Sequence, residues 1–205
     1  MKNIFVPLTF IVFFISCSTK KASYTDEIRL FQYVLNTVFA DIDKSPLLEE
    51  DLKTFKSLDF FDINKKYKIE AEFELTPNSD IFEMQTNTER LPLYKKYGIA
   101  TFTINDEKIA LNIYQSLDLT TTFNNDNYLF LPFNDATNGK TTYGGGRFID
   151  LEIPENDSKT IIIDFNKAYN PLCTYNPKFS CPIPPKENSI PIEIPAGVKA
   201  FGKKH

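Results

Sequence analysis

The stretch YKIEAEFEL, residues 67–75, alternates strictly between apolar and charged side chains. Every second residue from Tyr67 to Leu75 is apolar, whereas Lys68 and three glutamates stand between them. Side chains along a β-strand point alternately to the two faces of the sheet. The pattern therefore predicts a strand with one buried face and one solvated, acidic face, as in antiparallel sheets.

Further strand-like stretches follow this one at short intervals. They are GIATFTI (98–104), KIALNIY (108–114), NYLFLPF (127–133), RFIDLEI (147–153), KTIIIDF (159–165) and SIPIEI (189–194). Asn105 and Asp106 lie between the first two of these stretches and favour a tight hairpin turn. No helical pattern separates the strands, so we expect a largely antiparallel sheet.

Two stretches before the first strand have the spacing of amphipathic helices. Residues 26–42 place Ile28, Phe31, Leu35, Val38 and Ile42 on one stripe. A second helix is expected to begin with Ser45 as N-cap before Pro46, and its apolar residues are Leu48, Leu52, Phe55 and Leu58.

The prolines are concentrated near the C-terminus. Seven of the thirteen lie between Pro171 and Pro195, which is too dense for a helix or a central strand. We therefore expect a mainly β (α+β) fold, in the form of a largely antiparallel β-sandwich or partly open barrel. Two N-terminal helices and a proline-rich C-terminal loop complete the expected architecture.

The N-terminus has the marks of an export signal. Lys2 precedes an apolar run that ends in Ser16 and Cys17, which resembles a bacterial lipobox with phenylalanine where leucine is commoner. We interpret residues 1–16 as a lipoprotein signal peptide, 17–24 as a flexible tether and 25–205 as a single globular domain. An ordinary signal peptide or an uncleaved anchor is the alternative. The expected location is the cell envelope, with lipid on Cys17 as a membrane anchor on the periplasmic or outer-surface face.

Several classes of function are disfavoured by composition. The net charge of −4 at pH 7 argues against a nucleic-acid partner, which requires a clustered basic surface. The only histidine is His205, so histidine triads and histidine metal clusters are excluded, and we expect no metal and no cofactor. The sequence Gly139-Lys140-Thr141 suggests a P-loop, but the chain has Asn134 where that motif needs its first glycine.

The run Gly144-Gly145-Gly146 uses three of the seven glycines and leads directly into Arg147. One interpretation is a bulge or tight turn, with Arg147 paired to a carboxylate such as Asp164. The other interpretation is a site in which glycine amides and Arg147 bind an anionic or carbonyl group, while Asp164 orients Arg147 or acts as a base. Both interpretations place Arg147 and Asp164 close together.

Three stretches, in this order, resemble the C-terminal half of the domain of unknown function 1684 family. They are PFNDATNGKTTYGGGRFIDLE (132–152), DFNKAYNPLCTYN (164–176) and CPIPPKENSIPIEIPAG (181–197), and SPLLEEDLKTFKSLDFF (45–61) resembles its N-terminal part. The resemblance covers roughly residues 45–203, with Val198 where the family usually has glutamate. It brings no activity, but it implies that the polar residues of these stretches belong to one shared feature. The candidate binding or catalytic residues are Tyr143, Gly145, Gly146, Arg147, Asp150, Asp164, Asn166, Tyr169, Asn170 and Asn188.

Three functions remain open. A binding module would hold a small molecule or a glycan between the sheet and the proline-rich loop, using Arg147, Asn166, Asn170 and tyrosine faces. A hydrolase-type enzyme would use Asp150 or Asp164 with Arg147. A purely structural or assembly lipoprotein would have no small-molecule site.

The two cysteines after Cys17 are expected to form a disulfide. Cys173 and Cys181 are an even pair in an exported chain, and the turn-forming Asn176-Pro177 lies between them. A pair of metal ligands and two free thiols, with Cys173 as a nucleophile that lacks a histidine partner, are the alternatives.

Overall fold

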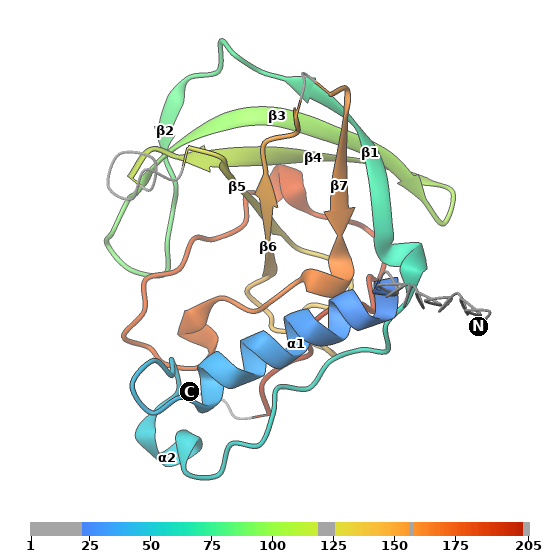
Figure 1. Ribbon diagram of the computed structural model, residues 1–205. Coiled ribbons are helices and arrows are strands. Elements are labelled where there is room, and N and C mark those ends of the chain that lie inside the picture. Colours follow the sequence, from blue (N-terminus) through green and yellow to red (C-terminus); the bar gives the residue numbers. More distant parts are fainter. Residues whose placement is uncertain (1–21, 119–125, 156–157, 203–205) are drawn as a thin grey trace, which may run out of the picture.

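A seven-stranded antiparallel sheet forms the body of the protein in the computed structural model, which describes residues 22–118, 126–155 and 158–202 (Figure 1). The predicted signal peptide and Cys17 lie outside the described residues. The strands are β1 (Lys68–Leu75), β2 (Ile81–Glu83), β3 (Leu93–Ile104), β4 (Glu107–Ser116), β5 (Tyr128–Phe133), β6 (Arg147–Glu152) and β7 (Thr160–Asp164). Their order across the sheet is β6-β5-β4-β3-β1-β7, with the short β2 on β3.

Six of these seven strands, all except β2, form at stretches that the sequence predicts. In β1, Ala71 and Phe73 are buried, whereas the intervening Glu72 is exposed. The predicted hairpin joins β3 to β4, and Asn105 and Asp106 have φ angles of 49° and 65°. Two consecutive residues with positive φ are the signature of a tight hairpin turn whose twist matches that of the strands.

The sheet curls so far that β6 and β7, its two edges, approach one another (Figure 1). The concave side encloses the main core, which includes Leu111, Leu131, Ile149 and Ile163, all at most 1% exposed. This curled half-barrel confirms the predicted fold class and selects the partly open barrel over the sandwich.

Helix α1 (Tyr24–Ala40) lies across one end of the curled sheet (Figure 1). It begins with Ser23 as N-cap, whose side chain and that of Asp26 form a reciprocal capping box. The second predicted helix is wrong in length, because α2 covers only Glu49–Leu52. Ser45 caps nothing there: its hydroxyl donates to the Phe39 carbonyl and accepts from the Leu47 N–H, which holds the chain in a turn.

The C-terminal segment contains only short 3-10 turns, as its prolines predict: η3 (Phe165–Lys167), η4 (Leu172–Thr174) and η5 (Lys186–Asn188). The predicted strand at 189–194 is wrong. Pro191 has no N–H for a ladder, and the segment is held through scattered bonds such as Ile190 N–H to the Asn134 carbonyl. Among the described residues, no helix has both the length and the apolar character that crossing a membrane requires.

Candidate functional site

The alternation in β5 and β6 sends aromatic side chains to the outer face of the sheet. Leu131 and Ile149 point into the main core, whereas Phe130 and Phe148 point outward and pack together with ring centroids 4.8 Å apart. Tyr94 of β3 adds a third ring, 5.8 Å from Phe130. So many large aromatic side chains on the outer face of the sheet are expected to be buried by another segment of the chain.

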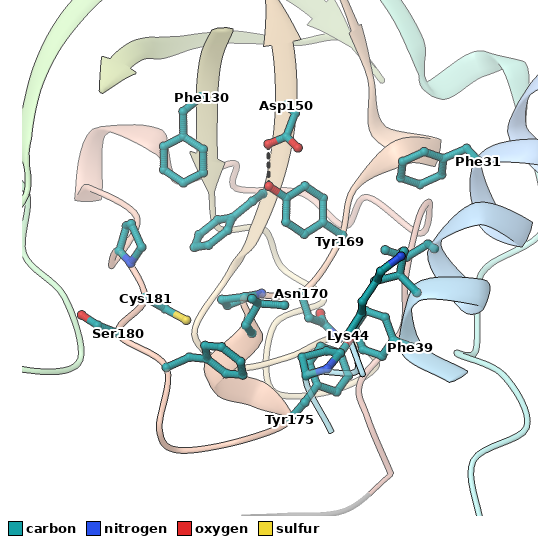
Figure 2. Close-up of a pocket in the computed structure, with 18 of the residues that line it drawn as sticks. Phe31, Phe39, Lys44, Phe130, Asp150, Tyr169, Asn170, Tyr175, Ser180 and Cys181 are labelled. Carbon is teal, nitrogen blue, oxygen red and sulfur yellow. Dashed lines mark hydrogen bonds between the residues drawn. The ribbon is translucent and has the colours of Figure 1, made fainter. Parts of the chain in front are cut away.

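The segment after β7 covers part of this outer face. Phe148 and Tyr169 exchange two backbone hydrogen bonds of 2.9 and 3.0 Å, which attach the segment to the edge of β6. From there residues 169–182 cross the outer face, while α1 approaches from the other side (Figure 2).

A cavity of about 550 Å³ remains between α1, the outer face of the sheet and residues 169–182 (Figure 2). We call it the outer cavity, and its volume is that of a typical small-molecule site. Its aromatic lining consists of Phe31, Phe39, Tyr94, Phe130, Phe148, Tyr169, Tyr175 and Phe179.

Asp150 provides a carboxylate at one end of the outer cavity (Figure 2). Its Oδ1 accepts hydrogen bonds from the hydroxyls of Tyr128, at 2.8 Å, and Tyr169. Burial, and then the charge of Asp150, raise the pKa of both tyrosines far above the ordinary value. Both hydroxyls therefore stay protonated and donate to the carboxylate. The carboxylate can accept further hydrogen bonds, so a ligand at this end can donate to it.

Asn170 lies in the wall of the outer cavity. Its Nδ2 donates to the Tyr175 hydroxyl and to the Lys199 carbonyl, at 3.2 and 3.0 Å. Its Oδ1 is buried and has no hydrogen-bond partner among the described residues. A buried acceptor without a partner is costly, and because this oxygen is closed to solvent it offers no contact to a ligand in the cavity.

Cys181 is buried in the wall of the outer cavity, and Cys173 lies beside it. The Cys173 N–H donates to Sγ of Cys181 at 3.0 Å, and both cysteines are free thiols in this structure. The hydrogen bond between the thiols, followed by burial, raises the pKa of Cys173, whereas the same hydrogen bond lowers the pKa of Cys181. Tyr143 is half-buried beside Cys173, outside the cavity.

Arg147 is not part of this cavity, and the expected pairing with Asp164 is wrong. Its side chain points to the inner face, where it is 0% exposed. Nη2 lies 2.7 Å from Oδ2 of Asp135 and 2.9 Å from the Ile194 carbonyl, and Nη1 bonds the Ala196 carbonyl. Arg147 therefore fastens the C-terminal segment to the sheet.

The glycine run is a turn into β6, so the interpretation as a tight turn holds. Gly146 has a φ of 89°, and a Cβ there would meet Cγ of Pro184 at 2.6 Å and the Phe133 carbonyl at 2.8 Å. A Cβ on Gly145 would meet the Tyr143 ring at 2.5 Å. Gly146 is therefore needed for backbone shape and close packing.

Asp164 and Asn166 belong to a separate cluster at the start of α1. Asp164 accepts from the Tyr24 hydroxyl at 3.0 Å, and Asn166 donates to the same hydroxyl at 2.8 Å. Asn166 also bonds both backbone groups of Asn64. Burial, and then Asp164, raise the pKa of Tyr24. The cluster fixes α1 to the sheet.

Asn188 has a similar structural role. It is 0% exposed and bonds the N–H and carbonyl of Asn112 and the carbonyl of Pro132, all within 2.8 Å. The proline-rich segment is thereby fixed to β4 and β5.

Of the ten predicted site residues, the outer cavity receives Asp150, Tyr169 and Asn170. The hydrolase alternative required Arg147 beside Asp150 or Asp164, and the structure separates these side chains. Among residues 22–118, 126–155 and 158–202, no three His, Cys, Asp or Glu side chains gather in a way that could hold a metal ion.

Sequence reasoning missed Asp135, Tyr24, Tyr128 and the cavity residues of α1. Tyr128 could have been predicted, because the alternation in NYLFLPF places it on the same face of the strand as Phe130. Asp135 lies within the quoted family motif, but its distance in sequence from Arg147 carries no pairing signal.

Comparison with known proteins gives a family and a fold neighbour. The family model described as "Protein of unknown function (DUF1684)" matches residues 53–199. The solution NMR structure of an uncharacterized protein from Haloarcula marismortui is similar, with a TM-score of 0.68 and 28% identity. That match covers 86% of this chain and 94% of the other. A search of the curated proteins gave no match.

Proposed function

The chain belongs to DUF1684, a family of unknown function, and we propose that this member is a cell-envelope lipoprotein that binds a small molecule in the outer cavity. The single observation that carries the proposal is the cavity itself: about 550 Å³ with a largely aromatic lining and the carboxylate of Asp150 at one end. Sites of this kind bury an apolar ligand body and orient it by a few polar groups.

The lining restricts the chemistry of the ligand. Most of it is aromatic or aliphatic, which favours an apolar body over a glycan. The carboxylate of Asp150 is an acceptor, so the ligand is expected to carry a hydroxyl or amine donor. The carboxylate of Asp150 disfavours an anionic ligand at that end.

The ligand class is tested by thermal shift of the mature protein with naphthalene, 1-naphthol and 1-naphthoate. We expect 1-naphthol to stabilise most, because it adds a donor to an apolar body, and 1-naphthoate to stabilise least. Asp150→Asn keeps the shape of the side chain but removes the charge, so it should reduce the discrimination against 1-naphthoate. Equal shifts for all three compounds in both proteins would contradict the assignment.

The anchor is tested separately. Cys17→Ala should remove metabolic lipid labelling and shift the protein out of the membrane fraction or leave it unprocessed. Unchanged labelling in this variant would contradict the anchor and leave the cavity proposal intact.

A further inference from the structure

The outward side of α1 carries apolar side chains and no charge over most of its length. Residues 30–40, LFQYVLNTVFA, contain no charged residue. Four of them form what we call the α1 outer stripe: Leu30, Tyr33, Val34 and Val38, which are 62%, 68%, 53% and 41% exposed.

The opposite side of α1 is already occupied, because Ile28 and Phe39 are buried against the protein. Exposed apolar surface of this kind marks a site of contact with a membrane or a protein.

The α1 outer stripe continues to the outer cavity. Val38 belongs to both, and Leu172, 39% exposed, borders the same cavity from the C-terminal segment. Whatever covers the stripe therefore also faces the mouth of the cavity.

The predicted lipid anchor indicates which surface contacts the α1 outer stripe. Cys17 precedes Tyr24 by seven positions, and an extended chain spans at most about 3.6 Å per residue. A lipid on Cys17 therefore keeps the start of α1 within about 25 Å of the bilayer surface. The bilayer is therefore an apolar medium within reach of the helix that carries the stripe.

We propose that the α1 outer stripe docks on the lipid bilayer and turns the mouth of the outer cavity toward the membrane. This inference rests on the lipid anchor of the proposed function. Interfacial helices bury their apolar side about 5–10 Å into the headgroup boundary. Because residues 30–40 lack Lys and Arg, the stripe itself contacts the bilayer through apolar area and not through charge. A membrane-dissolved ligand then reaches the cavity directly.

The absence of tryptophan from the chain allows a direct test. Val34→Trp places one fluorophore on the stripe, and Ile81→Trp places a matched one on β2, at a site that is 59% exposed. The lipidated protein is reconstituted in phosphatidylcholine vesicles with or without brominated acyl chains. We expect emission from Val34→Trp to shift to shorter wavelength and to lose intensity with brominated lipid, at low and high salt alike, whereas Ile81→Trp does neither.

The possible results of this experiment distinguish the lipid anchor from the docking of the α1 outer stripe. Co-flotation with vesicles but unquenched Val34→Trp emission would overturn the docking and leave the anchor intact. Loss of co-flotation would overturn the anchor, and the docking with it. A short-wavelength emission without vesicles, together with a dimer in sedimentation equilibrium, would assign the stripe to a second copy of the chain instead.

Discussion

The guanidinium of Arg147 lies 2.7 Å from the carboxylate of Asp135, and both side chains are fully buried on the inner face of the sheet. The remaining Nη contacts go to backbone carbonyls of Ile194, Ala196 and Val198. Burial lowers the pKa of Arg147, and the charge of Asp135 opposes that shift. The pair connects the turn before β6 to the end of the proline-rich segment.

Breaking this pair should be costly. Asp135→Asn leaves the Arg147 charge buried without its counter-ion, so the free energy of unfolding in urea should fall by about 3–5 kcal/mol. Glu193→Gln is the control, because it breaks the exposed pair of Glu193 with Lys140 and should cost under about 1 kcal/mol. Similar losses for the two variants would contradict the structural role of Arg147.

The glycine run offers a test within three residues. Gly146→Ala forces a Cβ onto a backbone with positive φ and into Pro184, so it should destabilise the protein by roughly 1–3 kcal/mol. Gly144→Ala should be nearly neutral, because its Cβ would meet only the Gly139 backbone at 3.8 Å. Thermal unfolding of both variants checks this, and the reverse order would refute the turn.

The cysteine pair stays predicted as a disulfide in the exported protein. The two residues are already in contact, and closure of so short a loop should contribute roughly 2–3 kcal/mol. Mass spectrometry under non-reducing conditions and urea unfolding with and without reductant measure both points. Two thiols that alkylate without prior reduction would show that the pair stays reduced.

The tyrosines at Asp150 predict an alkaline pH dependence. The pKa values of Tyr128 and Tyr169 are raised in the folded protein, so above the ordinary tyrosine pKa of about 10 the unfolded chain loses protons that the folded chain keeps. Stability is therefore complete below that pH and falls above it, by about 1.4 kcal/mol per pH unit for each such tyrosine. Tyr169→Phe should make the fall less steep between pH 10 and 11, and an unchanged slope would contradict the prediction.

Much of the fold follows from patterns that act locally. Alternation predicted β1, and Asn105-Asp106 predicted the β3–β4 turn, because strand faces and hairpin turns depend on neighbouring residues. Helical spacing after Ser45 overstated α2, because Phe55 and Leu58 pack in the cluster of Phe39 and Tyr175 from irregular backbone. The stretch SIPIEI alternates like a strand, but Pro191 and the contacts with Asn134 and Asp135 hold it outside the sheet.

The contacts between the site residues were harder to predict from the sequence, because the curl of the sheet decides which distant residues meet. Asp164 was the carboxylate expected beside Arg147, but Asp135 pairs with it instead, and no pattern in the sequence marks that pairing. Tyr169 and Asn170 were found because they follow a strand in a polar cluster. The helix residues that line the outer cavity have the spacing of ordinary core residues, so nothing marked Phe31 or Leu35 as part of a site.

The fluorescent probe N-phenyl-1-naphthylamine combines an apolar body with one N–H donor. Its binding therefore tests directly whether the outer cavity holds a small molecule of the proposed class. Leu172→Trp fills the outer cavity from its rim, whereas Ile183→Trp adds the same side chain to the same segment at an exposed site outside the lining. We expect saturable probe binding to the mature protein, loss of that binding in Leu172→Trp and retention in Ile183→Trp. Equal binding by both variants, or no saturable binding by the unmodified protein, would contradict it.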